Sequence, residues 1–360
     1  MHGCDGRRRD GAPHVQPPPR RVRRVWLLCA LALVLVAALP AHAAQAAGTA
    51  TPNDPYFVQH DQWPLGGQPA SIDAPGAWTA ITGAGVLIAD IDTGADFNHP
   101  DLAGRLVTGG RFTKCDGTLQ ATDQPSVQDD VGHGTMTTGL MVANTNNGIG
   151  IASVAPDARA LIIKVIDKSG TGCDPDISAA IRYAVSRGAK VINLSLGSDI
   201  PLAPLLVGST IPAAVRAAAQ SGVAVALAAG NSSLPFSDYD SVTDVALVVG
   251  ALGPDASVAP YSAGGGGVNV YAPGGDSGQS TSGPHAKGLV LSTALTNGGY
   301  TAEQGTSFAA PHVAGVLALL LACGLDGPQA RQRILSTARR SAGGVPRLDA
   351  ALAVHGAGHC

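Results

Sequence analysis

The sequence predicts an α/β protein with a mostly parallel sheet whose two faces are covered by helices. Apolar runs of strand length alternate with segments of helical periodicity, and the runs are apolar on both faces of the predicted strands. Hydrophobic residues make up 45 % of the 360 residues and charged residues 14 %, which excludes a disordered chain and supplies a sizeable core. No repeat or linker-like tract divides the chain after residue 47, so we expect one domain.

The first 46 residues have the pattern of an export signal. Arginines at positions 20, 21, 23 and 24 precede an uncharged apolar run over residues 25–39, which falls short of the ~20 residues that span a bilayer. Small residues follow in two A-x-A patterns. We therefore expect a signal peptide over 1–46, a secreted or periplasmic domain over 47–360, and no stable membrane anchor. An N-terminal anchor is the alternative.

Charge and cysteine content restrict the partners of the remaining chain. After residue 47, 24 acidic residues outnumber 16 basic ones and form no basic stripe, so nucleic acid is not an expected partner. Cys115, Cys173, Cys323 and Cys360 remain, an even number that favours disulfides in an oxidising compartment. Three pairings are possible. We favour Cys115–Cys173, both in loop-like stretches, and Cys323–Cys360, which would fasten the tail.

The predicted elements alternate regularly along the chain. Strands are expected over residues 86–91, 161–166, 191–194, 223–228 and 246–249. A helix capped by Asp174 carries an apolar face over residues 177–185, and Gly188 ends it. An Ala-rich helix covers residues 210–220, and the last clear helix covers 306–321.

Four segments carry residues suited to acid–base and nucleophilic chemistry. Asp92 ends the first strand in Ile-Asp-Thr-Gly, His133 lies in Gly-His-Gly-Thr before a helical pattern, and Asn231 follows a strand in Ala-Ala-Gly-Asn. Each of these alone is typical of a turn. The fourth segment, GTSFAAPHVAG over residues 305–315, is more specific, because it places Ser307 in the first turn of an apolar helix. Chemistry in open parallel sheets gathers at the carboxyl ends of the strands.

These segments resemble the subtilisin-like serine peptidases, the subtilases, over nearly all of residues 51–350. The resemblance implies a single subtilisin-like domain with a seven-stranded, mostly parallel sheet, acting as a secreted serine endopeptidase through an acyl-enzyme. Ser307 would be the nucleophile, His133 its base, and Asp92 the carboxylate that orients the imidazole. Asn231 would donate to the oxyanion beside the N–H of Ser307. Catalysis would need no cofactor, the partners would be protein or peptide substrates, and we expect a monomer.

Two further segments resemble the walls of the family's substrate cleft. They are Ser195, Leu196 and Gly197 on one side, and Ala228, Ala229 and Gly230 on the other. No charge is visible in either segment. This implies broad cleavage with an apolar preference before the cleaved bond, with main-chain pairing supplying much of the affinity.

A structural calcium ion is a further implication of the resemblance. Residues 51–57 resemble the start of the thermitase branch of the family, in which an aspartate binds calcium. The matching donors here are the side chains of Asp54, Asp101 and Asn147 and the carbonyl groups of Thr145, Ile149 and Ile151. Carboxylate, amide and main-chain oxygens suit a hard cation. An Asn-rich turn without an ion is the alternative.

Three residues near the motifs receive separate expectations. Asp90 stands where the family usually has an aliphatic residue, and it shares one strand face with Asp92, so it is expected to raise a pKa or to need a partner of its own. His312 lies five residues after Ser307, about 140° around the helix, and is expected to be structural. His99, in a turn-rich stretch, is interpreted in the same way.

Two other functions remain as alternatives. Only a few residues separate the expected signal cleavage site from residue 52, whereas family members usually carry a long folding pro-segment there. One alternative is a catalytically inactive binding protein with this fold. The other is a specialised maturation protease, or a transpeptidase that passes the acyl group to an amine.

Overall fold

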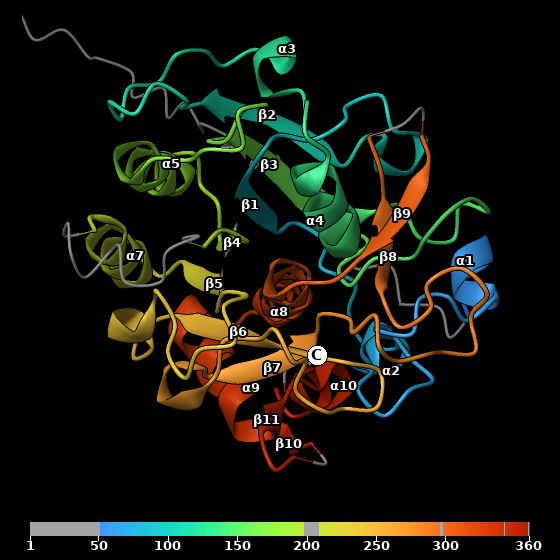
Figure 1. The fold of residues 1–360 in the computed structure, drawn as a ribbon. Coiled ribbons are helices and arrows are strands. Elements are labelled where there is room, and N and C mark those ends of the chain that lie inside the picture. Colours follow the sequence, from blue (N-terminus) through green and yellow to red (C-terminus); the bar gives the residue numbers. More distant parts are fainter. Residues whose placement is uncertain (1–50, 198–208, 296–297, 342, 359) are drawn as a thin grey trace, which may run out of the picture. The chain divides into compact units, whose positions relative to one another are not determined.

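Seven parallel strands of four to six residues form the central sheet of this computed structural model, in the spatial order β7-β6-β5-β4-β1-β3-β2 (Figure 1). Two strands of two residues, β11 and β10, extend the sheet beyond β7, while β8 and β9 pair separately. The predicted parallel α/β fold is confirmed. The strands are β1 (Leu87–Asp92), β2 (Leu106–Arg111), β3 (Arg159–Lys164), β4 (Val191–Leu194), β5 (Ala224–Ala228), β6 (Leu247–Leu252), β7 (Val270–Pro273), β8 (Val290–Thr293), β9 (Tyr300–Glu303), β10 (Arg339–Arg340) and β11 (Pro346–Arg347).

The structure describes residues 51–197, 209–295, 298–341, 343–358 and 360, so the predicted signal segment over 1–46 lies outside the described residues. The described helices are α1 (Pro55–Val58), α2 (Ala74–Trp78), α3 (Gln124–Val127), α4 (His133–Val142), α5 (Asp174–Ser186), α7 (Ile211–Gln220), α8 (Thr306–Ala322), α9 (Gly327–Thr337) and α10 (Ala350–His355). Within these described ranges, three short 3₁₀ turns cover Pro100–Leu102, Asp240–Val242 and Gly265–Gly267.

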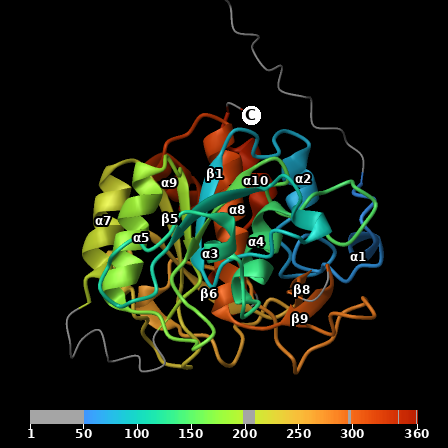
Figure 2. The ribbon, with the colours of Figure 1, turned by 90° about the horizontal axis from the view of Figure 1, so that it is seen from above.

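Helices cover both faces of the sheet, as Figure 2 shows. Helices α5 and α7 pack on one face, and α4 and α8 pack on the other. Alternate residues of β1 enter two separate cores: Ile88 faces the side of α4 and α8, whereas Ala89 and Ile91 face α5 and α7. Strands buried on both faces are therefore apolar throughout, as the sequence predicts.

One predicted cap is wrong. The N-cap of α5 is Cys173, and Asp174 is the first helical residue. The carboxylate of Asp174 instead accepts a hydrogen bond from the main-chain N–H of Thr210, the residue that precedes α7. The carboxylate of Asp174, which the local pattern predicts as the cap of α5, thus bonds to the start of α7 instead.

Helix α8 lies against the centre of the sheet and is almost wholly buried. No single helix among the described residues is long and apolar enough to cross a membrane. Helices α8 and α9 together have the length and apolar composition that a membrane span would need, but the pair is bent by 118° between them.

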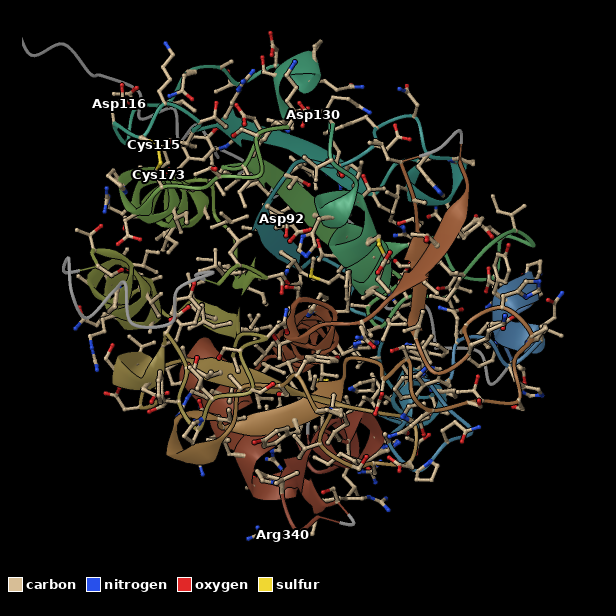
Figure 3. All side chains as sticks on the ribbon, viewed as in Figure 1. Asp92, Cys115, Asp116, Asp130, Cys173 and Arg340 are labelled. Carbon is tan, nitrogen blue, oxygen red and sulfur yellow. A yellow bond between two sulfur atoms is a disulfide. The ribbon has the colours of Figure 1, made fainter. Side chains whose placement is uncertain are left out.

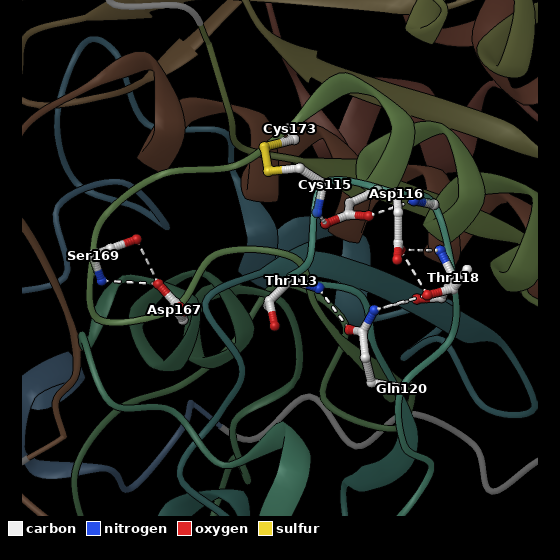
Figure 4. Close-up of a disulfide and its surroundings, with 10 residues drawn as sticks. Thr113, Cys115, Asp116, Thr118, Gln120, Asp167, Ser169 and Cys173 are labelled. Atoms are coloured by element: carbon white, nitrogen blue, oxygen red, sulfur yellow. Dashed lines mark hydrogen bonds between the residues drawn. A yellow bond between two sulfur atoms is a disulfide. The ribbon is translucent and has the colours of Figure 1, made fainter.

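Both favoured cysteine pairs are joined in the structure. Cys115 bonds to Cys173 and Cys323 bonds to Cys360, with Cα–Cα distances of 5.2 and 5.1 Å. Figures 3 and 4 show the first bridge, which ties the loop after β2 to the N-terminus of α5. The second bridge ties the end of α8 to the C-terminal tail.

Candidate active site

Strand β1 lies where the strand order reverses, because β3 and β2 follow on one side of it and β4, β5, β6 and β7 follow on the other. In doubly wound sheets such a switch point opens a crevice beyond the carboxyl ends of the strands. Asp92 is the last residue of β1 and is 1 % exposed. Figure 3 shows it near the centre of the view, beside α4.

A short hydrogen bond joins Asp92 to His133, the first residue of α4. Nδ1 of His133 lies 2.7 Å from Asp92 Oδ1, which also accepts the main-chain N–H of Thr93 at 2.7 Å. Gly134 allows this close approach, because a Cβ at that position would collide with the carbonyl oxygen of Gly94 beyond the end of β1. The imidazole also lies near the ring of Phe308, in a tilted arrangement with centroids 5.4 Å apart.

Three carboxylates control the charge of His133. Burial is the largest single effect and opposes the charged imidazolium, but the charge and hydrogen bond of Asp92 together with the charges of Asp90 and Asp129 outweigh it, and the pKa of His133 rises to about 9. The ring is therefore a stronger base than an ordinary histidine and becomes neutral only at alkaline pH.

Asp129 holds the turn that delivers His133, a role that the sequence motifs do not indicate. Its Oδ1 accepts hydrogen bonds from the Thr93 hydroxyl and from the N–H groups of Val131 and Gly132. Its Oδ2 accepts the N–H and the hydroxyl of Thr135 in the first turn of α4. One buried carboxylate thus joins the end of β1 to the start of α4.

Ser307 is the second residue of α8 and lines the same cleft as His133. Its main-chain carbonyl accepts a hydrogen bond of 2.8 Å from Ser195 Oγ, which follows β4. Its side chain therefore stands at the N-terminal end of a helix, where the backbone dipoles favour developing negative charge.

The amide of Asn231 is oriented by the residue that precedes Ser307. Its Oδ1 accepts hydrogen bonds from the main-chain N–H and the hydroxyl of Thr306, at 2.9 and 3.0 Å. Thr306 Oγ1 also accepts the N–H of Gly230 at 3.1 Å. With its oxygen fixed against α8, Asn231 keeps its Nδ2 for other acceptors.

The cleft around these residues has a volume of about 440 Å³. It brings together His133, Ser307 and Asn231 with Ser195, Leu196, Gly197, Ala228 and Gly230 from the two predicted walls. Asp92 lies behind His133, and the side chain of Ala229 packs into the core beneath α5 and α7 instead of lining the cleft. Sequence reasoning missed Thr93, Val131, Ile166, Gly170, Ser232 and Thr306, of which all but Ile166 and Gly170 lie within two residues of a predicted site residue.

The two other motif histidines lie away from this cleft. His312 is fully buried in α8, where its Nδ1 donates to the carbonyl of Phe308, and burial lowers its pKa to about 4. His99 is also fully buried. Its Nδ1 accepts the N–H of Asp101, and its Nε2 lies 2.9 Å from the carbonyl oxygen of Gly299. Both rings are thus engaged with main-chain groups.

The predicted calcium ligands gather around one loop. Asp54 Oδ2 accepts the N–H of Asn146, while Asp101 accepts Nδ2 of Asn147 and the N–H of Ile151. The remaining predicted donors, the carbonyl groups of Thr145, Ile149 and Ile151, belong to the same loop between α4 and β3. Burial raises the pKa of both aspartates, and Asp54 Oδ1 is buried without a hydrogen-bond partner.

An orphaned carboxylate oxygen beside amide and main-chain oxygens fits a hard cation. Within residues 51–197 and the other described ranges, no group of three or more His, Cys, Asp or Glu side chains is placed to hold a metal ion. A cation at this loop would therefore need amide and carbonyl oxygens as ligands in addition to the carboxylates of Asp54 and Asp101.

Comparison with known proteins gives a consistent result. A family model described as the subtilase family matches residues 83–353. Thermitase from Thermoactinomyces vulgaris is 37 % identical over 293 residues, which cover 81 % of this chain and 93 % of thermitase. The major intracellular serine protease of Bacillus subtilis (strain 168) is 34 % identical over 258 residues, covering 69 % of this chain and 72 % of that protein. A solved structure of a protease from Pseudoalteromonas arctica PAMC 21717 matches with a TM-score of 0.74 and 31 % identity, covering 86 % of this chain and 100 % of that one.

Proposed function

The chain belongs to the subtilase family and is a serine peptidase, and we propose that it is a secreted endopeptidase that forms an acyl-enzyme on Ser307. The observation that carries the proposal is the 2.7 Å hydrogen bond from His133 to the buried Asp92, beside a cleft that His133 shares with Ser307 and Asn231. A base, its orienting carboxylate, a hydroxyl and an amide donor are the groups that acyl transfer requires.

In the proposed mechanism, His133 takes the proton of Ser307 Oγ as that oxygen attacks the peptide carbonyl carbon. Asp92 holds Nδ1 of the ring and stabilises the imidazolium that forms. Nδ2 of Asn231 and the N–H of Ser307 donate to the oxyanion. The peptide C–N bond then breaks as His133 protonates the leaving amine, and a water molecule activated by the same base hydrolyses the ester. The reaction needs no cofactor.

The cleft walls support an apolar preference before the cleaved bond. Leu196 and Ala228 both line the cleft, as do Gly197 and Gly230, which carry no side chain. Among the described residues that line the cleft, none carries a carboxylate or an amine that would select a charged side chain. We further propose secretion, from the export pattern of the first 46 residues, and a structural calcium ion held by Asp54, Asp101, Asn147 and main-chain carbonyls.

Labelling with a fluorophosphonate probe tests the nucleophile without knowledge of the substrate, because the probe reacts with a serine that has a competent base. We expect the wild-type protein to be labelled and Ser307→Ala to remain unlabelled. Ser232→Ala removes another serine hydroxyl from the same cleft and is expected to label normally. Folded wild-type protein that stays unlabelled would favour the inactive binding protein, and labelling that persists in Ser307→Ala would assign the nucleophile elsewhere.

A further inference from the structure

A second carboxyl group lies on β1, on the same strand face as Asp92. Asp90 is 1 % exposed, and the polar side chains around it are also buried. The hydroxyl groups of Thr137 and Thr138 donate to its Oδ2 at 2.8 and 2.6 Å. Nδ2 of Asn193, on β4, donates to its Oδ1 at 2.9 Å. Both carboxylate oxygens therefore have the hydrogen-bond partners that a buried polar group needs.

The amide of Asn193 continues this network toward α8. Its Nδ2 also donates to Ser195 Oγ at 3.0 Å, and Ser195 Oγ donates to the main-chain carbonyl of Ser307 at 2.8 Å. An ionised carboxylate only accepts hydrogen bonds, so Asp90 turns the Nδ2 side of the Asn193 amide toward itself. The second N–H of that amide then bonds to Ser195 Oγ, whose own proton is left for the carbonyl of Ser307.

The other end of the network reaches the helix that begins with His133. Thr137 and Thr138 lie just over one turn after His133 in α4. The carboxylate of Asp90 thus links α4, through these two hydroxyl groups, to β4, through Asn193. Ser195 continues the chain of hydrogen bonds to the first turn of α8. An aliphatic side chain at position 90 would make none of these hydrogen bonds.

Building on the function proposed above, we propose that Asp90 is a positioning residue, which fixes the main chain of Ser307 relative to the helix that carries His133. Asp90 does not line the cleft, so it acts only through Asn193 and Ser195 on one side and through α4 on the other. Such alignment matters for the chemical step, because a displacement of about 1 Å at a reacting centre costs on the order of 10²-fold in rate.

The elements around Asp90 contribute few other charges. Asp92 lies on β1 itself, His133 begins α4, Lys164 ends β3, and His312 is buried in α8. Helix α5 packs on the opposite face of β1. Burial, followed by the negative charge of Asp92, raises the pKa of Asp90 to about 7, which lies below the pKa of about 9 of His133. At a pH where His133 is neutral, Asp90 is thus ionised and accepts hydrogen bonds.

A double-mutant cycle tests the proposed path. Wild type, Asp90→Val, Ser195→Ala and the double variant are compared by kcat and KM on one peptide substrate, per active molecule counted with the fluorophosphonate probe. The comparison is made above pH 9, where His133 is neutral with or without the Asp90 charge. We expect Asp90→Val to lower kcat about tenfold, with a smaller change in KM, and to add almost nothing in the Ser195→Ala background. Asp90→Asn, which keeps an acceptor for Asn193, is expected to recover most of the loss. Two independent losses that multiply in the double variant would overturn the proposal.

A second variant covers the case in which Asp90→Val does not fold. Asn193→Ala removes the middle of the path and leaves Asp90 with its two threonine donors. It is expected to lower kcat by a similar factor and to be equally non-additive with Ser195→Ala. An unchanged kcat in Asn193→Ala would exclude the path.

Two controls separate this inference from a general loss of stability and from the proposed function. Asp61 is also buried and accepts the N–H groups of His285 and Ala286, but it does not line the cleft. The effect of Asp61→Asn on kcat should therefore multiply with that of Ser195→Ala. If hydrolysis persists in Ser307→Ala, the proposed function fails and the inference fails with it. If hydrolysis depends on Ser307 but the Asp90 and Ser195 losses multiply, only the inference fails.

Discussion

At the scale of single residues, three carboxylates act on the imidazole of His133. Asp92 bonds directly to His133, and Asp90 and Asp129 add negative charge. These charges keep the imidazole protonated at neutral pH. In the proposed mechanism, His133 must therefore lose this proton before it can accept one from Ser307, and the same charges would stabilise the imidazolium that then forms.

The first prediction concerns the pH dependence of kcat/KM. Because His133 accepts a proton only when neutral and its pKa is raised to about 9, kcat/KM should rise about tenfold per pH unit below pH 9 and level off above it. Asp90→Asn removes one of the negative charges that raise this pKa, so its acidic limb should move to lower pH. The check is a pH profile on an uncharged peptide. A wild-type midpoint near the ordinary histidine value of about 6.5 would contradict the prediction.

At the scale of elements, the Cys115–Cys173 disulfide supports one side of the cleft. The segment between β3 and α5 contributes Ile166 and Gly170 to the cleft, and Cys173 ends it. The partner loop is held twice, because Asp176 of α5 also accepts the N–H groups of Cys115 and Gly117, at 2.7 and 2.8 Å. Figure 4 shows the bridge and, earlier in the same segment as Cys173, the turn in which Asp167 accepts the N–H of Ser169.

The second prediction is that loss of this bridge weakens substrate binding. The double variant Cys115→Ser/Cys173→Ser should raise KM several-fold with a smaller effect on kcat, because the Asp92–His133 pair is anchored elsewhere, in β1 and α4. The variant should also lose about 2–4 kcal/mol of stability. Cys323→Ser/Cys360→Ser is the matched control: it should lose stability without the change in KM, because no described residue after Ser307 lines the cleft. Equal effects of the two double variants on KM would contradict the anchoring role.

At the scale of the whole molecule, the calcium candidate joins the N-terminal segment to the body of the protein. Asp54 precedes α1, whereas Asp101 and Asn147 belong to segments on either side of α4. The buried, partnerless Oδ1 of Asp54 is a cost that a bound cation would remove. Binding to the folded state alone would stabilise the entire domain.

The third prediction is that calcium raises the thermal midpoint Tm. A concentration 100 times the dissociation constant would add about 2.7 kcal/mol, and a chelator should remove that gain. Asp54→Asn should abolish the calcium-dependent part of the shift, whereas Asp255→Asn, an exposed carboxylate elsewhere, should keep it. Thermal unfolding with and without calcium is the measurement. A Tm that does not respond to calcium in the wild type would exclude the ion.

Much of the fold and site was predictable because it depends on local pattern. The apolar runs that became β1, β3, β4, β5 and β6 shift by at most three residues at either end between prediction and structure. Strands β2 and β9 were not predicted, because β2 contains two consecutive glycines and β9 is polar and only partly buried. Their partners in the sheet or hairpin, and not their own composition, make them strands.

By itself, the sequence determined the parallel α/β architecture and the residue types of the candidate site. Both depend on patterns within short segments: the apolar runs of the strands, and the motifs around Asp92, His133 and Ser307. Only the tertiary structure decided which atoms meet. The path from Asp90 to Ser307 joins residues 103 positions apart and then 112 positions apart, and the role of Asp129 depends on how β1 and α4 approach. Hydrogen bonds form according to distance and direction in space, and no local pattern specifies these for segments so distant in the chain.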